Sequence, residues 1–178
     1  MPTNLVLTLT GPDRIGIVEE VTRVLLEAGG NVESSRMARL GGEFAVIALV
    51  AVPGGDVGDI EDSLEPLIAV GYRVTVSRTG AGAGVAQAGW RPYQIAVQGA
   101  DHEGIIHEIS AGLSHAGITI ESVETGVTEA PISAAPLFWM TALVAVPPQL
   151  AEAEWTAALK HAAEQSGVDV EVVGAETR

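Results

Sequence analysis

The sequence lacks cysteine and is poor in cations, and each shortage excludes a class of function. None of the 178 residues is a cysteine, so disulfides, thiolate metal sites and a cysteine nucleophile are excluded. Only 9 residues are lysine or arginine against 23 aspartates and glutamates, which gives a net charge of −14. Nucleic acids and anionic membranes attract basic surfaces, so neither is expected as a direct partner.

Long hydrophobic runs are also missing. The longest apolar run covers residues 44–53, whereas a membrane-spanning helix needs about 20 apolar residues. Residues 1–4 carry no basic segment of the kind that opens a signal peptide. Because 47% of the residues are apolar, the chain can still bury a core, and we expect a soluble cytoplasmic protein.

An internal repeat organises the chain. Residues 9–34 align without a gap with residues 97–122, at an offset of 88. The segment ALVAVP at 48–53 recurs at 142–147, at an offset of 94, so the second copy has six extra residues. We place these residues within 126–136, because prolines interrupt strands there. We therefore predict a first domain over 1–79, a Gly/Ala-rich linker over 80–91 and a second domain over 92–178.

Hydrophobic periodicity predicts the order βαββαβ in each copy. Leu5, Leu7 and Leu9 alternate with smaller or polar residues as in a strand, and residues 17–28 carry one apolar helical stripe. Pro66 lies inside the second predicted helix, where a kink or early break is expected. The predicted fold class is α+β: two ferredoxin-like domains, each a four-stranded antiparallel sheet with two helices on one face. The expected strands cover 5–10, 31–40, 43–52 and 72–77, then 93–98, 118–128, 137–146 and 168–173; helices are expected over 17–28, 60–68, 102–116 and 151–162.

Such a domain leaves one face of its sheet without a helix. In the strand over 43–52, either the set Ala45, Ile47 and Leu49 or the set Phe44, Val46 and Ala48 lies on that face. The same alternation separates Trp139 from its neighbours in the second copy. A face of this kind is normally covered by another domain or chain, so we expect a homodimer.

The common signatures of enzymes and cofactor sites do not fit. His102 and His107 are five residues apart, whereas the two histidines of a zinc-protease helix are four apart. The glycines of residues 80–84 lack the dinucleotide-binding spacing and follow a closing strand with no helix after them. We therefore predict no catalytic residue, no metal ligand and no cofactor.

One motif recurs in both copies, at the turn between the first strand and the first helix. It places Asp13 three residues before Gly16, and Asp101 three residues before Gly104. One interpretation is a helix cap, in which the aspartate accepts hydrogen bonds from the first-turn N–H groups, a contribution of about 1 kcal/mol. The other is a binding site, in which the bare glycine lets a carboxylate reach those N–H groups while the aspartate holds an ammonium group. Together these groups would suit a free α-amino acid.

The turn motif, the helix exits AGGNVES and AGITIES and the βαββαβ period resemble the ACT domain family. Two such domains in tandem resemble the glycine cleavage repressor family within it. The resemblance implies regulatory binding of a small molecule, usually an amino acid, at domain interfaces. The ligand-contacting positions that it implies are Asp13, Gly16, Ile17 and Asn31 in the first copy and Asp101, Gly104, Ile105 and Thr119 in the second. Thr119 stands where the family has asparagine, so two sites of unequal strength, or one competent site, are expected.

The leading hypothesis is a non-catalytic regulator that binds an amino acid such as glycine or serine and acts on amino-acid metabolism through a partner regulatory protein. The alternative is a protein-interaction module that keeps the fold without a ligand site. An enzyme using Asp101, His102 or Glu103 as acid or base is the least favoured, because no oriented pair of base and nucleophile can be named.

Overall fold

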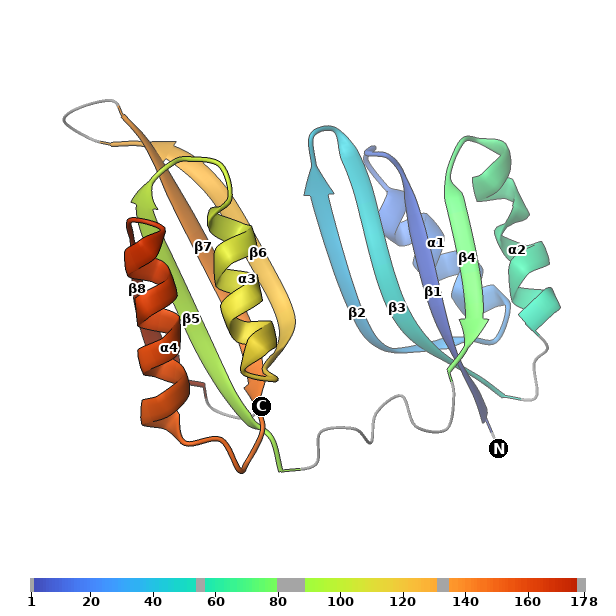
Figure 1. Cartoon of the computed structure of the whole chain (residues 1–178). Helices are drawn as coiled ribbons and strands as arrows, with labels where there is room; N and C mark the ends of the chain where they lie inside the picture. The colour runs from blue at the N-terminus through green and yellow to red at the C-terminus, as the bar shows by residue number, and fades with distance from the viewer. Residues whose placement is uncertain (1, 54–56, 80–88, 131–134, 176–178) are drawn as a thin grey trace. The chain divides into compact units, whose positions relative to one another are not determined.

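The computed structural model describes residues 2–53, 57–79, 89–130 and 135–175 (Figure 1). The chain divides into two compact units, Met1–Gly84 and Val85–Arg178. Residues 80–88 of the predicted linker lie outside the described residues, so the linker stays a prediction. A strand begins at Arg91, inside the range assigned to the linker.

Domain 1 has the predicted order of elements. They are β1 (Pro2–Pro12), α1 (Ile17–Glu27), β2 (Asn31–Leu40), β3 (Glu43–Pro53), α2 (Val57–Ala69) and β4 (Arg73–Arg78). The strands pair antiparallel in the order β2-β3-β1-β4, and both helices pack on one face of the sheet (Figure 1). Leu5, Leu7 and Leu9 alternate along β1 and are buried under the helices, because successive strand residues point to opposite faces.

Domain 2 repeats the arrangement. Its elements are β5 (Arg91–Ala100), α3 (Ile105–His115), β6 (Thr119–Glu129), β7 (Pro136–Val146), α4 (Glu152–Gln165) and β8 (Val168–Gly174). The strand order β6-β7-β5-β8 matches that of domain 1, and the pairing is again antiparallel. The predicted α+β class with two βαββαβ units is therefore confirmed.

Two prolines behave differently from expectation. The early break expected at Pro66 was wrong, since α2 continues through it to Ala69. Leu64 and Leu67 flank this proline and are fully buried, so tertiary packing outweighs the lost backbone hydrogen bond. Pro136 opens β7 opposite Glu129 instead of interrupting it, and the six extra residues of the second copy lengthen the β6–β7 hairpin. Pro131 lies outside the described residues.

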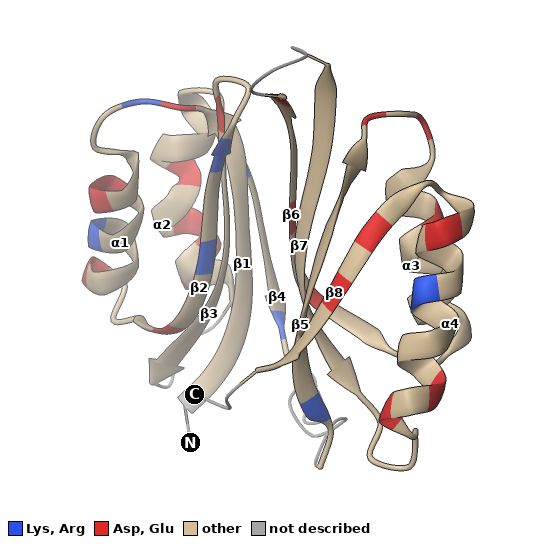
Figure 2. Ribbon diagram, turned by 90° about the vertical axis from the view of Figure 1, so that its left-hand side faces the viewer, with Lys and Arg blue, Asp and Glu red and all other residues tan. Residues whose placement is uncertain are grey.

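The structure also settles which strand residues face the helices. Phe44, Val46 and Ala48 are buried on the helix-covered face, whereas Ile47 points the other way and is 51% exposed. In domain 2 Phe138 is likewise buried, and Trp139 lies on the opposite face. Acidic residues are spread along the helices of both domains (Figure 2). No helix within the described ranges is both long and apolar enough to cross a membrane. The expected homodimer stays a prediction.

Candidate functional site

The turn before the first helix has the same backbone conformation in both domains. Gly16 and Gly104 are the residues that precede α1 and α3, with φ of 88° and 97°. A residue with a side chain loses about 1–2 kcal/mol in this left-handed region, which explains why glycine stands there. Neither helix has a side-chain cap among the described residues. The interpretation of Asp13 and Asp101 as helix caps was therefore wrong, because each helix begins four residues after its aspartate.

Each aspartate is held by the hairpin of its own domain. The N–H of Asp13 donates to the carbonyl oxygen of Gly42 at 2.9 Å, and the N–H of Asp101 donates to that of Pro136 at 3.1 Å. The carboxylate of Asp13 also forms an ion pair with Arg39, with 2.7 Å between Oδ2 and Nε. The turn is thus fixed against the β2–β3 or β6–β7 hairpin, and in domain 1 its carboxylate contacts the edge strand β2.

A cavity lies beside each turn, between the first helix and the edge strand. It measures about 280 Å³ in domain 1 and about 690 Å³ in domain 2. Every residue that lines the first cavity has its repeat equivalent in the lining of the second, which also includes His107 and Ser110. The equivalent pairs are Asp13/Asp101, Arg14/His102, Gly16/Gly104, Ile17/Ile105, Val18/Ile106, Met37/Thr125, Ala38/Gly126, Arg39/Val127 and Phe44/Phe138.

The two cavities differ most at the position of Arg39 and Val127. Arg39 pairs with Phe44 across the hairpin, and Val127 pairs with the equivalent Phe138, so the two residues hold the same register position. Sequence reasoning did not select either residue. The repeat alignment carried the signal, because it places an arginine opposite a valine within the hairpin.

Not all the predicted ligand positions come together. Asn31 and Thr119 begin β2 and β6, after the C-terminal ends of α1 and α3. An 11-residue helix is about 16 Å long, so these two residues lie at the opposite end of each domain from the turn. The N–H of Ile17 donates to the carbonyl oxygen of Arg14 at 3.3 Å and is not open, contrary to expectation.

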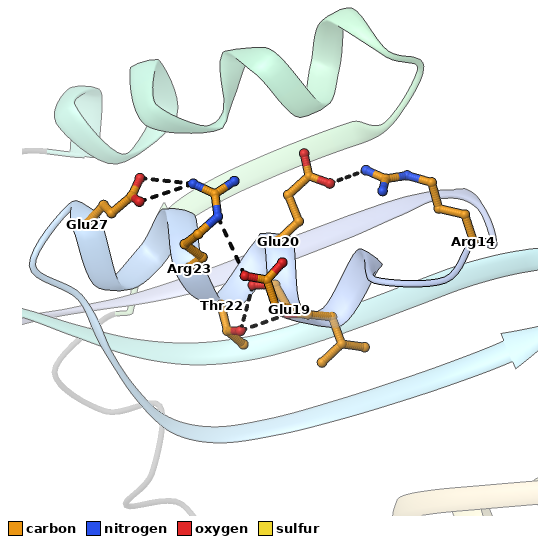
Figure 3. A network of polar contacts seen from close by, with 7 residues as sticks. Arg14, Glu19, Glu20, Thr22, Arg23 and Glu27 are labelled. Atoms are coloured by element: carbon orange, nitrogen blue, oxygen red, sulfur yellow. Dashed lines mark hydrogen bonds and ion pairs between the residues drawn. The ribbon is translucent and has the colours of Figure 1, made fainter.

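In domain 1 a network of charges surrounds the turn (Figure 3). Arg14 forms an ion pair with Glu20, and its guanidinium lies 5.7 Å from the centre of the Tyr72 ring. The Tyr72 hydroxyl donates to the carbonyl oxygen of Pro12 at 2.7 Å. Further along α1, Arg23 contacts Glu19 at 3.6 Å and Glu27 at 3.1 Å (Figure 3). The network restrains the turn, and Arg14 also lines the cavity.

In domain 2 a histidine takes the place of Arg14. Nδ1 of His102 lies 3.0 Å from the carbonyl oxygen of Glu103, and Nε2 lies 2.7 Å from that of Ser166. Carbonyl oxygens only accept hydrogen bonds, so both contacts are satisfied together by the doubly protonated ring. The carbonyls of Glu103 and Ser166 accordingly raise the pKa of His102. Since both nitrogens are engaged, this ring is poorly placed to act as a base. The described residues contain no cluster of histidine and carboxylate side chains that could hold a metal ion.

Comparison with known proteins defines the class. Residues 3–70 match the model of the ACT domain family. A solved structure of an unknown protein from Galdieria sulphuraria is 35% identical, with a TM-score of 0.88, and the match covers 99% of this chain and 100% of that one. Residues 3–70 therefore belong to the ACT domain family, and both domains of the chain have the same fold.

A more particular relationship is to the glycine cleavage system transcriptional repressor of Escherichia coli strain K12. The two are 43% identical over 60 residues, which is 34% of this chain and 32% of the repressor. The match thus spans about a third of the repressor's length. A solved structure whose protein is named as a repressor of this kind has the same fold, with a TM-score of 0.70 at 21% identity and 99% coverage of each chain.

Proposed function

We propose that the protein is a non-catalytic regulator that binds a free amino acid, such as glycine or serine, in the cavities beside Gly16 and Gly104. The observation that carries the proposal is the repeated cavity, lined at nine equivalent positions in both domains and flanked in each by an aspartate and a helix start. Its groups are complementary to a zwitterion. A carboxylate side chain accepts from an ammonium group, and the uncapped start of a helix favours an anion.

The family relationship supports a regulatory role over a catalytic one. The curated relative is named a transcriptional repressor, and the two ring nitrogens of His102 are already engaged. An acidic chain is poorly suited to contact DNA directly, since DNA binding relies on lysine and arginine at the phosphates. We therefore propose that the signal reaches its target through a partner protein, and that the ligand acts by binding one pairing geometry of the domains more tightly than another.

A ligand screen tests the proposal on the full chain. Each of the twenty amino acids is added during thermal unfolding, and hits are measured by calorimetry. A ligand at a hundredfold excess over its Kd stabilises the folded state by about 2.7 kcal/mol. The double substitution Asp13→Asn and Asp101→Asn keeps side-chain size and removes both carboxylates, so we expect it to abolish the response. No response of the unmodified chain to any amino acid would contradict the proposal.

A second candidate function is a protein-interaction module without a ligand. It is favoured by apolar side chains on the helix-free sheet face, where Ile47 is 51% and Val173 is 54% exposed. This module would bind its partner equally well with and without amino acids, and the double aspartate variant would bind as the unmodified chain does.

A further inference from the structure

We infer that a free amino acid binds more tightly in the cavity of domain 2 than in that of domain 1. In domain 1 the Arg39 side chain is already paired with the Asp13 carboxylate, which the ligand's ammonium group would use. The inference rests on the proposed function and specifies which of the two sites senses the ligand. The sequence predicted the second site to be the weaker one because of Thr119. That residue does not line the cavity of its own domain, so it does not set the order of the two sites.

The first observation is the ion pair itself. Arg39 Nε lies 2.7 Å from Asp13 Oδ2, so the chain supplies its own cation to the site in domain 1. At the same register position domain 2 has Val127, which has no charge to offer. No ion pair of Asp101 occurs among the described residues, and its neighbour in sequence, His102, points its ring nitrogens at two backbone carbonyls. Asp101 therefore accepts an external ammonium group without displacing an arginine.

The second observation is the charge beside the helix start. His107 lines the domain 2 cavity, and its repeat equivalent in domain 1 is Glu19. Glu19 is in the first turn of α1, where its negative charge, although paired with Arg23 at 3.6 Å, opposes the binding of a ligand carboxylate to the same turn. Domain 2 has no anion at that position. Both ends of a zwitterion thus meet less competition in domain 2, and the larger volume, about 690 Å³ against about 280 Å³, acts in the same direction.

The size of the difference follows from the exposure of the pair. The Arg39 side chain is 73% exposed, and exposed ion pairs contribute little because water screens them. The upper end of their range corresponds to about a fivefold change in an equilibrium constant. We expect Arg39 to weaken binding in domain 1 by about this factor, and Glu19 to weaken it further.

A site-resolved titration tests the inference. The full chain, labelled with ¹⁵N, is titrated with glycine or L-serine, and the amide signals of Gly16 and Gly104 report each cavity separately. We expect Gly104 to saturate at a concentration at least fivefold lower than Gly16. Acetate, which lacks the ammonium group, loses the part of that preference that is due to Arg39 and keeps only the part that is due to Glu19 and cavity size. Saturation of Gly16 first, or of both together, overturns the inference, whereas no shift of either signal with any amino acid contradicts the proposed function.

Exchanging the two residues sharpens the result. Arg39→Val should lower the Kd at Gly16 about fivefold, and Val127→Arg should raise the Kd at Gly104 by a similar factor. Val127 is 54% exposed, so the arginine can extend into solvent without disturbing the core. The matched controls are Arg36→Val, which removes a cation from the outward face of the same strand, and Val127→Ala. Unchanged Kd values in both exchange variants overturn the inference, as does an equal effect of Arg36→Val.

Discussion

The two domains have the same fold, line their cavities with equivalent positions and bond the aspartate N–H of the turn to the hairpin, yet the side chains that hold the turn are unrelated. In domain 1 the turn is held by the Tyr72 hydroxyl and by Arg14 with its partner Glu20. In domain 2 Val168 occupies the place of the tyrosine beside the strand end, and His102 bonds to the carbonyl of Ser166 instead. The difference shows that the backbone geometry at the turn is what the two copies share, while the side chains that support it are free to vary.

The cores differ in the same way. Domain 1 packs leucines against Phe44 and Tyr72, whereas domain 2 is built around Trp155, which meets Tyr93 edge to face at 5.2 Å between ring centres. An interior filled by one large aromatic depends more on that single side chain than does an interior shared among several leucines. A core substitution in one domain should therefore lower the stability of that domain and leave the other domain unchanged.

The largest effect is expected from Trp155→Ala, which should destabilise domain 2 by about 3–5 kcal/mol. Trp155 is 2% exposed, and its buried Nε1 has no hydrogen-bond partner among the described residues, so the expected loss is one of packing. Hydrogen exchange on the full chain should show reduced protection in β5 and β7 and unchanged protection in β1 and β3. Lys160→Ala, on the exposed face of α4, is the control. Equal loss in both domains would mean that they unfold as one unit.

Substitution by alanine should change the free energy of unfolding in opposite directions at two glycines of domain 2, one in the shared turn and one within α3. Gly104→Ala should destabilise by about 1–2 kcal/mol, because φ is 97° although nothing lies within 4 Å of the added Cβ. Gly112→Ala should stabilise by about 0.5–1 kcal/mol, because the added Cβ meets only the Ala162 Cβ at 3.6 Å and helix propensity improves. Urea denaturation measures both. A neutral Gly104→Ala would refute the requirement for a left-handed residue, and Gly16→Ala repeats the test in domain 1.

A smaller effect is expected from Tyr72→Phe, which removes the hydrogen bond to the Pro12 carbonyl and keeps the ring. A net loss of about 1 kcal/mol is typical of such a bond. Only domain 1 should respond, since the equivalent contact in domain 2 is the aliphatic Val168. Exchange rates of β1 amides provide the measurement, and β5 amides serve as the internal reference. No change in β1 would show that the Tyr72 hydrogen bond does not restrain the turn.

The smallest effect is a dependence on pH that is confined to domain 2. The folded pKa of His102 is raised, so its stabilising contribution is fully present below the unfolded pKa of about 6.5 and is lost as the pH rises through the folded value. Arg14 keeps its charge across this range, so the corresponding turn of domain 1 should not change. Thermal unfolding from pH 5.5 to 8.5, with His102→Gln as the comparison, measures the difference. A variant with the same pH profile as the unmodified chain would exclude His102 as its source.

Much of the fold was predictable because its signals are local. Alternation along residues 5–9 and the stripe over residues 17–28 each follow from one element's own periodicity, and the repeat alignment checked each prediction against a second copy. The early break predicted at Pro66 was wrong because the local penalty is offset by leucines that meet their partners only after folding. The repeat located the turn motif, but the aspartate was interpreted as the helix cap, whereas the glycine is the residue that immediately precedes the helix.

The sequence by itself determined the duplication, the order of strands and helices and the positions of the two turns, because repetition and periodicity are properties of the chain. The tertiary structure decided which side chains meet at those turns. Arg39 is 26 residues from Asp13 along the chain, and only the pairing of β2 with β3 brings its guanidinium to that carboxylate. Charge pairing of this kind depends on distances in space, which sequence separation does not encode.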